Sequence, residues 1–134
     1  MNWEKRSWIK VRREADTVRA IMESKRMADR LGFDDYHCQK IATAVSELVR
    51  NIIKYADWGE VIISPITEAK KTGIEITVQD RGSGIADLDC AMQDDFSSSG
   101  TLGLGLPGVK RLMDEFAISS EVNVGTRIVI KQWL

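Results

Sequence analysis

The sequence lacks the features by which a metal or redox site made of cysteine and histidine is recognised. It has two cysteines, Cys38 and Cys90, which form no C-x-x-C pair, and its single histidine is His37. Zinc sites and redox motifs need clusters of these residues at short spacings. The sequence therefore predicts two free thiols in a reducing cytoplasm and a histidine that is structural or merely exposed.

Long apolar runs and an excess of one charge are missing too. A membrane-spanning helix needs about 18 consecutive apolar residues, and no stretch of the sequence approaches that length. The N-terminus MNWEKRSWIK has no apolar signal segment. Nineteen Lys and Arg stand against twenty Asp and Glu, a net charge of -1. We therefore expect a cytoplasmic protein with neither a membrane nor a nucleic acid as its partner.

The length of 134 residues suits one domain with a single sizeable core. No internal repeat, low-complexity tract or linker divides the chain, so we expect residues 1–134 to form a single domain. A dinucleotide-binding fold made of two βαβαβ halves would not fit comfortably into this length.

The N-terminal half alternates between strand and helix patterns. The segment SWIKVRRE alternates as a strand does, and residues 15–32 have helical spacing with Gly32 as a stop. The apolar positions of that helix are Val18, Ile21, Met22 and Leu31. A second helix begins at Asp34 and Asp35 and is expected to run to about Tyr55.

The C-terminal half is expected to contain two hairpins and a helix. GEVIISPIT and GIEITVQD are predicted strands joined by the polar turn EAKKTG, and a loop-rich stretch follows them. Pro107 suits the first turn of a helix that runs to about Phe116. FAISSEV and GTRIVIKQWL then form a hairpin that turns at 123–125. This order favours an α+β fold: one mixed sheet with helices on one face.

The second helix has two distinct faces. Its predicted core-facing stripe consists of Ile41, Val45, Leu48, Ile52 and Tyr55. Glu47, Asn51 and Lys54 share a different arc on the flank of that stripe. They form either a solvated polar flank or a site in which Asn51 supplies an oxygen ligand to Mg²⁺ and Glu47 acts as a base.

The segment QDRGSGI places an acid at the end of a β-branched strand. Asp80 is followed by Gly82, Gly84 and Ile85. Glycines there allow a flat ligand to approach the backbone closely, and the carboxylate could accept a hydrogen bond from the exocyclic amine of adenine. A plain strand-ending turn is the alternative.

The stretch GTLGLGLPGVKRLMDEF contains the spacing G-x-G-x-x-G at Gly103, Gly105 and Gly108. A dinucleotide fingerprint needs a strand directly before these glycines, but the preceding QDDFSSSGTL is polar. Glycine-rich backbone that leads into a helix N-terminus still attracts phosphate. The stretch therefore predicts a phosphate binder of another kind.

The order of these motifs is more specific than any one of them. ELVRN on a helix, DRGSG after a strand, GLGLPG at a helix start and a late GT resemble the Bergerat-fold ATPases and kinases of the GHKL superfamily. The short form, with Glu at the head of the first motif, resembles the anti-sigma-factor serine kinases. ISPITEAKKTG, DDFSSSG and GLPGVKRLMDEF are similar to the stressosome switch kinases. The resemblance implies a two-layer sandwich whose mixed, mainly antiparallel sheet has helices on one face.

The resemblance implies ATP and Mg²⁺ as cofactors and a role for each matching residue. Glu47 would be the catalytic base for the incoming hydroxyl and Asn51 the Mg²⁺ ligand. Asp80 would accept the adenine amine, and Thr126 would make a second contact near the purine. The remaining nucleotide-binding residues implied are Gly82, Gly84, Ile85, Gly100, Gly103, Leu104 and Gly105.

One departure from the family pattern concerns the lid. Sporulation-type relatives place an arginine there, but DDFSSSGTLGLG contains no basic residue. Lys54, one turn after Asn51, is our candidate for the cation that meets the terminal phosphate. The alternative for Lys54 is a solvated lysine at the helix end. Lys110, Arg111 or a cation that the partner lends are the other candidates for this role.

For partners, the resemblance implies STAS-domain proteins of a stressosome, which accept phosphate on Ser or Thr. The released kinase would then activate a downstream effector such as a phosphatase. Three alternatives are an anti-sigma factor kinase that binds a sigma factor and phosphorylates an anti-anti-sigma STAS protein, a non-catalytic ATP-dependent binding module, and a hydrolytic ATPase subunit.

Overall fold

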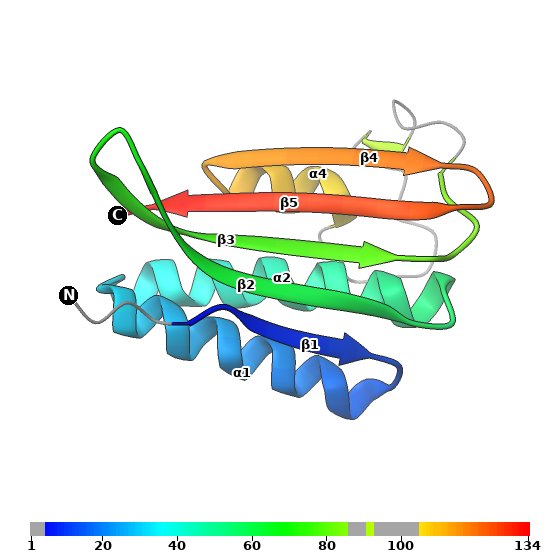
Figure 1. Ribbon diagram of the computed structural model, residues 1–134, viewed down its shortest axis with the longest axis horizontal. Coiled ribbons are helices and arrows are strands. Elements are labelled where there is room, and N and C mark those ends of the chain that lie inside the picture. Colours follow the sequence, from blue (N-terminus) through cyan, green and yellow to red (C-terminus); the bar gives the residue numbers. More distant parts are fainter. Residues whose placement is uncertain (1–4, 86–90, 93–104) are drawn as a thin grey trace.

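The computed structural model describes residues 5–85, 91–92 and 105–134. Within them, a five-stranded sheet in the order β1-β2-β3-β5-β4 lies over helices α1, α2 and α4, which cover one of its faces (Figure 1). The strands are β1 Ser7–Val11, β2 Gly59–Glu68, β3 Lys71–Asp80, β4 Glu115–Glu121 and β5 Gly125–Trp133. The helices are α1 Glu14–Leu31, α2 Asp35–Tyr55 and α4 Gly105–Leu112.

All four pairings between the described strands are antiparallel. Two of them are hairpins, and the link from β1 to β2 runs out along α1 and back along α2. The predicted α+β sandwich with helices on one face is confirmed. The sheet was predicted as mixed and mainly antiparallel, and its described part contains antiparallel pairs alone.

The hairpin between β2 and β3 has a shorter turn than EAKKTG suggested. Glu68 pairs with Lys71, so only Ala69 and Lys70 form the turn. Both have positive φ, 48° and 69°, which is the backbone of a tight two-residue hairpin. The second hairpin turns at residues 122–124, where Asn123 has φ 68°, close to the predicted position.

Helix α2 follows the sequence prediction except at its last residue. The Asp34 carboxylate caps its start by accepting the His37 backbone N–H at 2.8 Å. The predicted stripe is buried up to Ile52, but Tyr55 is 64% exposed. Gly59, the first residue of β2, faces the Ile52 side chain so closely that an added Cβ would lie 2.8 Å from it. The sheet therefore begins opposite Ile52, and the last turn of α2 extends beyond it.

Helix α1 buries only part of its predicted apolar stripe: Ile21 and Leu31 pack against the core, but the other two residues do not. Val18 is 56% and Met22 65% exposed. The buried positions are Thr17, Ala20, Ser24, Met27 and Ala28. Most of these side chains are small, and small side chains let a helix lie close to the layer that it covers.

Helix α4 ends earlier than predicted, and Phe116 lies in β4. The backbone N–H of Asp114 donates to Gln132 Oε1 at 3.0 Å. The Asp114 carboxylate accepts the Trp133 backbone N–H at 2.9 Å. These two bonds attach Asp114, the last residue before β4, to β5 and turn the chain into the sheet. No helix in the described ranges is long and apolar enough to cross a bilayer.

Met27 and Met22 provide a matched test of which face of α1 is buried. Met27 is fully buried, so Met27→Ala should lower the free energy of unfolding by about 2–5 kcal/mol. Met22→Ala, on the exposed face, should change it by no more than about 0.5 kcal/mol. Urea unfolding followed by circular dichroism measures both. Equal losses in the two variants would contradict the orientation of α1.

Candidate functional site

The flank of α2 presents two polar side chains without internal partners. Glu47 and Asn51 are half-buried, one turn apart, beside the buried stripe that packs on the sheet. Neither side chain has a hydrogen bond or ion pair within the part of the chain that the structure describes. Half-buried polar groups are usually satisfied by protein, water or ligand. Their oxygens are thus open to solvent or to a ligand.

The Asp80 carboxylate at the end of β3 is held through one of its two oxygens. Its Oδ1 accepts the backbone N–H of Gly82 at 2.8 Å and that of Thr126 at 3.3 Å. Its Oδ2 has no partner among the described residues. Because both bonds restrain the carboxylate, the second oxygen is available in a defined direction.

The loop after Asp80 passes between the end of α2 and the turn from β4 to β5. A Cβ added at Gly82 would lie 2.9 Å from the Tyr55 carbonyl oxygen. At Gly84, which has φ 78°, it would lie 2.3 Å from the Glu121 carbonyl oxygen. Only glycine fits either position. The two glycines therefore bring the Asp80 loop against the helix that carries Asn51.

Ser120 on β4 joins the other predicted site residues, although sequence reasoning missed it. Its hydroxyl accepts the Ile85 backbone N–H at 2.7 Å and lies 2.7 Å from the Thr126 hydroxyl. It also lies 3.2 Å from the Gly125 carbonyl oxygen. The alternating exposure of β4 puts Ser120 on the helix side of the sheet. The register of the β4–β5 hairpin pairs Ser120 with Thr126, and this register is the signal from which the contact could have been predicted.

The structure brings together only part of the predicted set. Asp80, Gly82, Ile85 and Thr126 share the network just described, and α4, which begins at Gly105 with φ 67°, packs on α2. The remaining predicted phosphate-binding residues lie outside the described residues: Gly100, Gly103 and Leu104.

Lys54 lies at the exposed end of the α2 flank. Its ammonium is 5.2 Å from the centre of the Tyr55 ring, and no ion pair holds it within the described ranges. A cation over an aromatic face at an exposed site gains only about 0.5–1 kcal/mol. The side chain can therefore leave Tyr55 for an anion at little cost.

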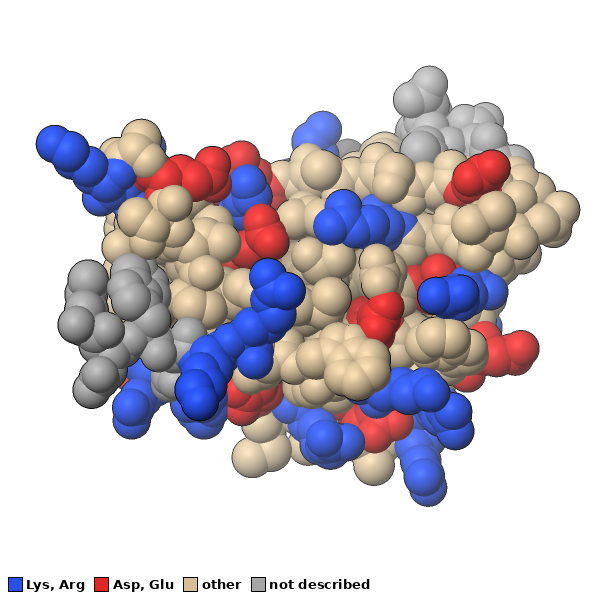
Figure 2. Space-filling model, viewed as in Figure 1, with Lys and Arg blue, Asp and Glu red and all other residues tan. Residues whose placement is uncertain are grey.

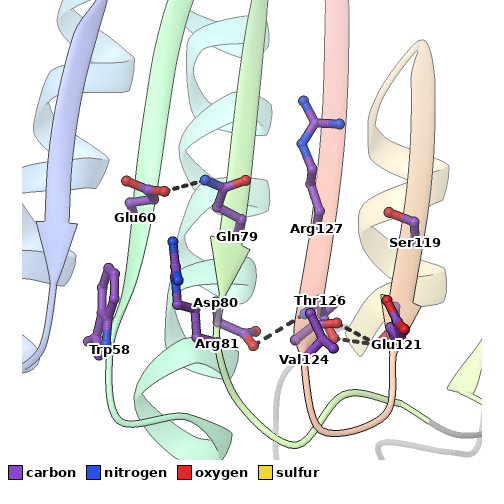
Figure 3. Close-up of a pocket in the computed structure, with 12 residues that line it drawn as sticks. Trp58, Glu60, Gln79, Asp80, Arg81, Ser119, Glu121, Val124, Thr126 and Arg127 are labelled. Carbon is purple, nitrogen blue, oxygen red and sulfur yellow. Dashed lines mark hydrogen bonds between the residues drawn. The ribbon is translucent and has the colours of Figure 1, made fainter.

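A cavity of about 510 Å³ opens at the same ends of the strands, but on the other face of the sheet (Figure 3). Its lining includes Asp80 and Thr126, and also Trp58, Arg81 and Arg127. No residue of α2 or α4 lines it. The cavity therefore opens away from α2, but its lining also includes Asp80, Ser120 and Thr126 of the candidate site.

Residues 11–132 match the family described as histidine kinase-like ATPase domain. The chain belongs to this family. The serine/threonine-protein kinase RsbT of Bacillus subtilis (strain 168) is 44% identical over 96% of each chain. An anti-sigma F factor of Geobacillus thermodenitrificans (strain NG80-2) is 39% identical over 69% of this chain and 67% of its own.

Solved structures support the same family at the level of fold. The mycobacterial sensor histidine kinase MprB superposes with a TM-score of 0.58, at 18% identity, over 96% of this chain and 97% of its own. Among the histidine kinase-like ATPases, the near full-length likeness to RsbT identifies this protein as a serine/threonine kinase that uses ATP. The predicted enzyme class and superfamily are confirmed.

Gly125 and Gly32 test how tightly the strand ends are packed. Both have a positive φ, 143° and 106°, but a Cβ at Gly125 would lie 2.1 Å from the Asp80 carbonyl oxygen. At Gly32 the nearest atom would be 3.9 Å away. Both alanine variants should suffer backbone strain, and Gly125→Ala should lose at least about 1 kcal/mol more stability. Urea unfolding measures the difference, and equal losses would contradict the close packing.

Proposed function

We propose that this kinase transfers the terminal phosphoryl group of ATP to Ser or Thr of STAS-domain proteins in a stressosome-like complex. After transfer it would bind and activate a downstream effector such as a phosphatase. The observation that carries the proposal is the restrained Asp80 carboxylate, whose loop packs on the end of the helix that bears Glu47 and Asn51. The near full-length likeness to RsbT supports the substrate class.

Asp80 is suited to select adenine. Its Oδ2 is free among the described residues, while Oδ1 is occupied by two backbone N–H groups. The free oxygen would accept a hydrogen bond from the exocyclic amine, which guanine does not present at that position. The absent side chain of Gly82 leaves the loop backbone exposed to the flat ring. Thr126, whose amide already binds Asp80, would contribute the second contact near the purine.

The α2 flank fits the phosphate end of the nucleotide. Asn51 offers an unpartnered amide oxygen, a hard ligand of the kind that Mg²⁺ takes along with water and phosphate oxygens. When bound there, Mg²⁺ would neutralise charge on the triphosphate. Glu47, one turn earlier, would accept the proton of the incoming Ser or Thr hydroxyl as the oxygen attacks phosphorus.

Two further groups are proposed to meet the phosphates. The backbone from Gly100 through Gly103 and Leu104 to Gly105 leads into α4 and would cradle them at the helix N-terminus. Lys54 would provide the cation at the terminal phosphate, since its ammonium is held only by the Tyr55 ring within the described chain. Together, the backbone N–H groups and the Lys54 ammonium would place positive charge beside the transferred phosphoryl group, where negative charge must be stabilised in the transition state.

A second candidate function follows from the relatives named anti-sigma F factor. In that function the protein would bind a sigma factor and phosphorylate an anti-anti-sigma STAS protein. A pull-down that recovers a sigma factor in an ATP-dependent way would favour it. Binding of ATP without transfer to any STAS-domain protein from the same genome would instead favour a non-catalytic module.

Asp80→Asn tests the adenine contact with little change in shape. The variant's Oδ1 can still accept the N–H groups of Gly82 and Thr126, but an amide nitrogen replaces the free oxygen. We expect ADP affinity to fall about 10- to 100-fold, the value of a charge-assisted hydrogen bond. Calorimetry measures it. Asp57→Asn is the control, because Asp57 is exposed just beyond α2. Unchanged affinity in Asp80→Asn would remove the adenine assignment.

Glu47→Gln separates chemistry from binding. The amide keeps the shape of the side chain but cannot take a proton, so the rate of transfer should fall about 10²- to 10⁴-fold. ATP and acceptor affinities should stay near those of the wild type. Asn51→Ala should differ, because it should also weaken nucleotide binding in the presence of Mg²⁺ relative to EDTA. A normal transfer rate in Glu47→Gln, measured with labelled ATP, would contradict the mechanism.

A further inference from the structure

The Ser120 hydroxyl takes no part in the nucleotide contacts proposed above, although three groups of the site meet on it. Ser120 lies on β4 opposite Thr126 and is half-buried. Its oxygen is 2.7 Å from the Ile85 backbone nitrogen, 2.7 Å from the Thr126 hydroxyl oxygen and 3.2 Å from the Gly125 carbonyl oxygen. A hydroxyl has one proton and two lone pairs, so these three contacts use its whole capacity.

The direction of each proton around Ser120 follows from what its neighbours can do. The Ile85 backbone N–H can only donate, so it occupies one lone pair of the Ser120 oxygen. The Gly125 carbonyl can only accept, so the Ser120 proton points toward it. The Thr126 hydroxyl is then the donor in its contact with Ser120. This is the one assignment that makes all three contacts hydrogen bonds, and it leaves Thr126 no proton for a ligand.

The loop that carries Ile85 is bound to the β4–β5 hairpin at a second point. The backbone N–H of Asn123 donates to the Ser83 carbonyl oxygen at 2.8 Å. Between the two bonds, Gly84 lies so close to the hairpin that an added Cβ would be 2.3 Å from the Glu121 carbonyl oxygen. A loop held on both sides of this glycine keeps the Ile85 N–H directed at its acceptor, so that lone pair stays occupied.

Thr126 and Asp80 then present the same chemistry to the purine. The Thr126 backbone N–H binds Asp80 Oδ1, so the two residues are neighbours at the strand ends (Figure 3). The free Oδ2 of the ionised Asp80 can only accept, and so can a Thr126 hydroxyl whose proton is given to Ser120. Two neighbouring acceptors match the amine at position 6 of adenine. They oppose the carbonyl oxygen that hypoxanthine has at the same position.

We propose that Ser120 is a positioning residue that makes the nucleotide site selective for a purine with an amine at position 6. It acts by taking the Thr126 proton, which would otherwise be free to donate to a carbonyl oxygen. This role rests on the adenine contacts of Asp80 and Thr126 proposed above. A single neutral hydrogen bond changes an equilibrium about 2- to 10-fold. The contribution of Ser120 is therefore smaller than that of the Asp80 charge, and it adds to it.

The test compares ADP with IDP, whose base is hypoxanthine. Because the phosphates are identical, the charges of both signs that Figure 2 shows over the protein surface act alike on the two nucleotides. Calorimetry gives the ratio of the two dissociation constants. Ser120→Ala should lower the preference for ADP about 2- to 10-fold, because the freed Thr126 proton can donate to the carbonyl oxygen of IDP. Ser119→Ala, the same change on the exposed side of β4, is the control and should keep the wild-type ratio.

A double-mutant cycle separates the effect of the proton from any loosening of the loop. Loss of the Ile85 bond in Ser120→Ala would weaken ADP and IDP binding alike and leave their ratio unchanged. Thr126→Val keeps the shape of the side chain but has no proton to release, so adding Ser120→Ala to it should not change the ratio further. Ser120→Thr keeps the hydroxyl and should keep the wild-type ratio. If Ser120→Ala does not fold, Ser120→Cys replaces it, because a thiol is a weak acceptor.

The outcomes distinguish this role from the proposed function. A ratio in Ser120→Ala equal to that in Ser119→Ala would overturn the role of Ser120. The same change of ratio with and without the Thr126 hydroxyl would overturn it too. In both cases a wild type that prefers ADP leaves the adenine assignment of Asp80 standing. A wild type that binds ADP and IDP equally, or binds neither, would overturn that assignment and the role of Ser120 together.

Discussion

The bond between the Asp80 carboxylate and the Thr126 backbone N–H is the contact around which the site is organised. It ties the end of β3 to the start of β5, where Gly125 has no side chain and its backbone meets the Asp80 carbonyl. The same carboxylate oxygen turns the following loop by binding Gly82. One anionic oxygen thus fixes two strands and a loop, and it leaves the other oxygen for a ligand. A neutral side chain could not hold two N–H groups as strongly.

Helix α2 carries two neighbouring faces: a buried apolar stripe and a polar flank with the proposed site residues. Its stripe from Ile41 to Ile52 is buried against the sheet, and burying side chains of this size stabilises the fold by about 1.5–3 kcal/mol each. That burial fixes the rotation of the helix about its axis. Glu47 and Asn51 therefore project from its flank in a direction that the buried stripe sets. Their own side chains make no hydrogen bond within the described residues that would help to orient the helix.

The ends of β3 and β5 present different chemistry on the two faces of the sheet. Asp80 and Thr126 belong to the proposed nucleotide site, and Arg81 and Arg127, which directly follow them, line the cavity of Figure 3 together with them. Alternation along a strand makes such a pairing possible, because neighbouring side chains point to opposite faces.

The sequence alone determined the helices and hairpins, the buried stripe of α2 and the family, because these depend on local periodicity, turn residues and ordered motifs. Tertiary structure decided the rest. The buried face of α1 depends on where small side chains allow close approach, so Val18 and Met22 are exposed despite their apolar character. The end of α4 depends on bonds from Asp114 to the distant β5. Ser120 meets Ile85 and Thr126, and Gln79 lies beside Arg127, only through the folded sheet. Contacts between residues far apart in the chain have no periodic signal, so only the folded sheet brings them together.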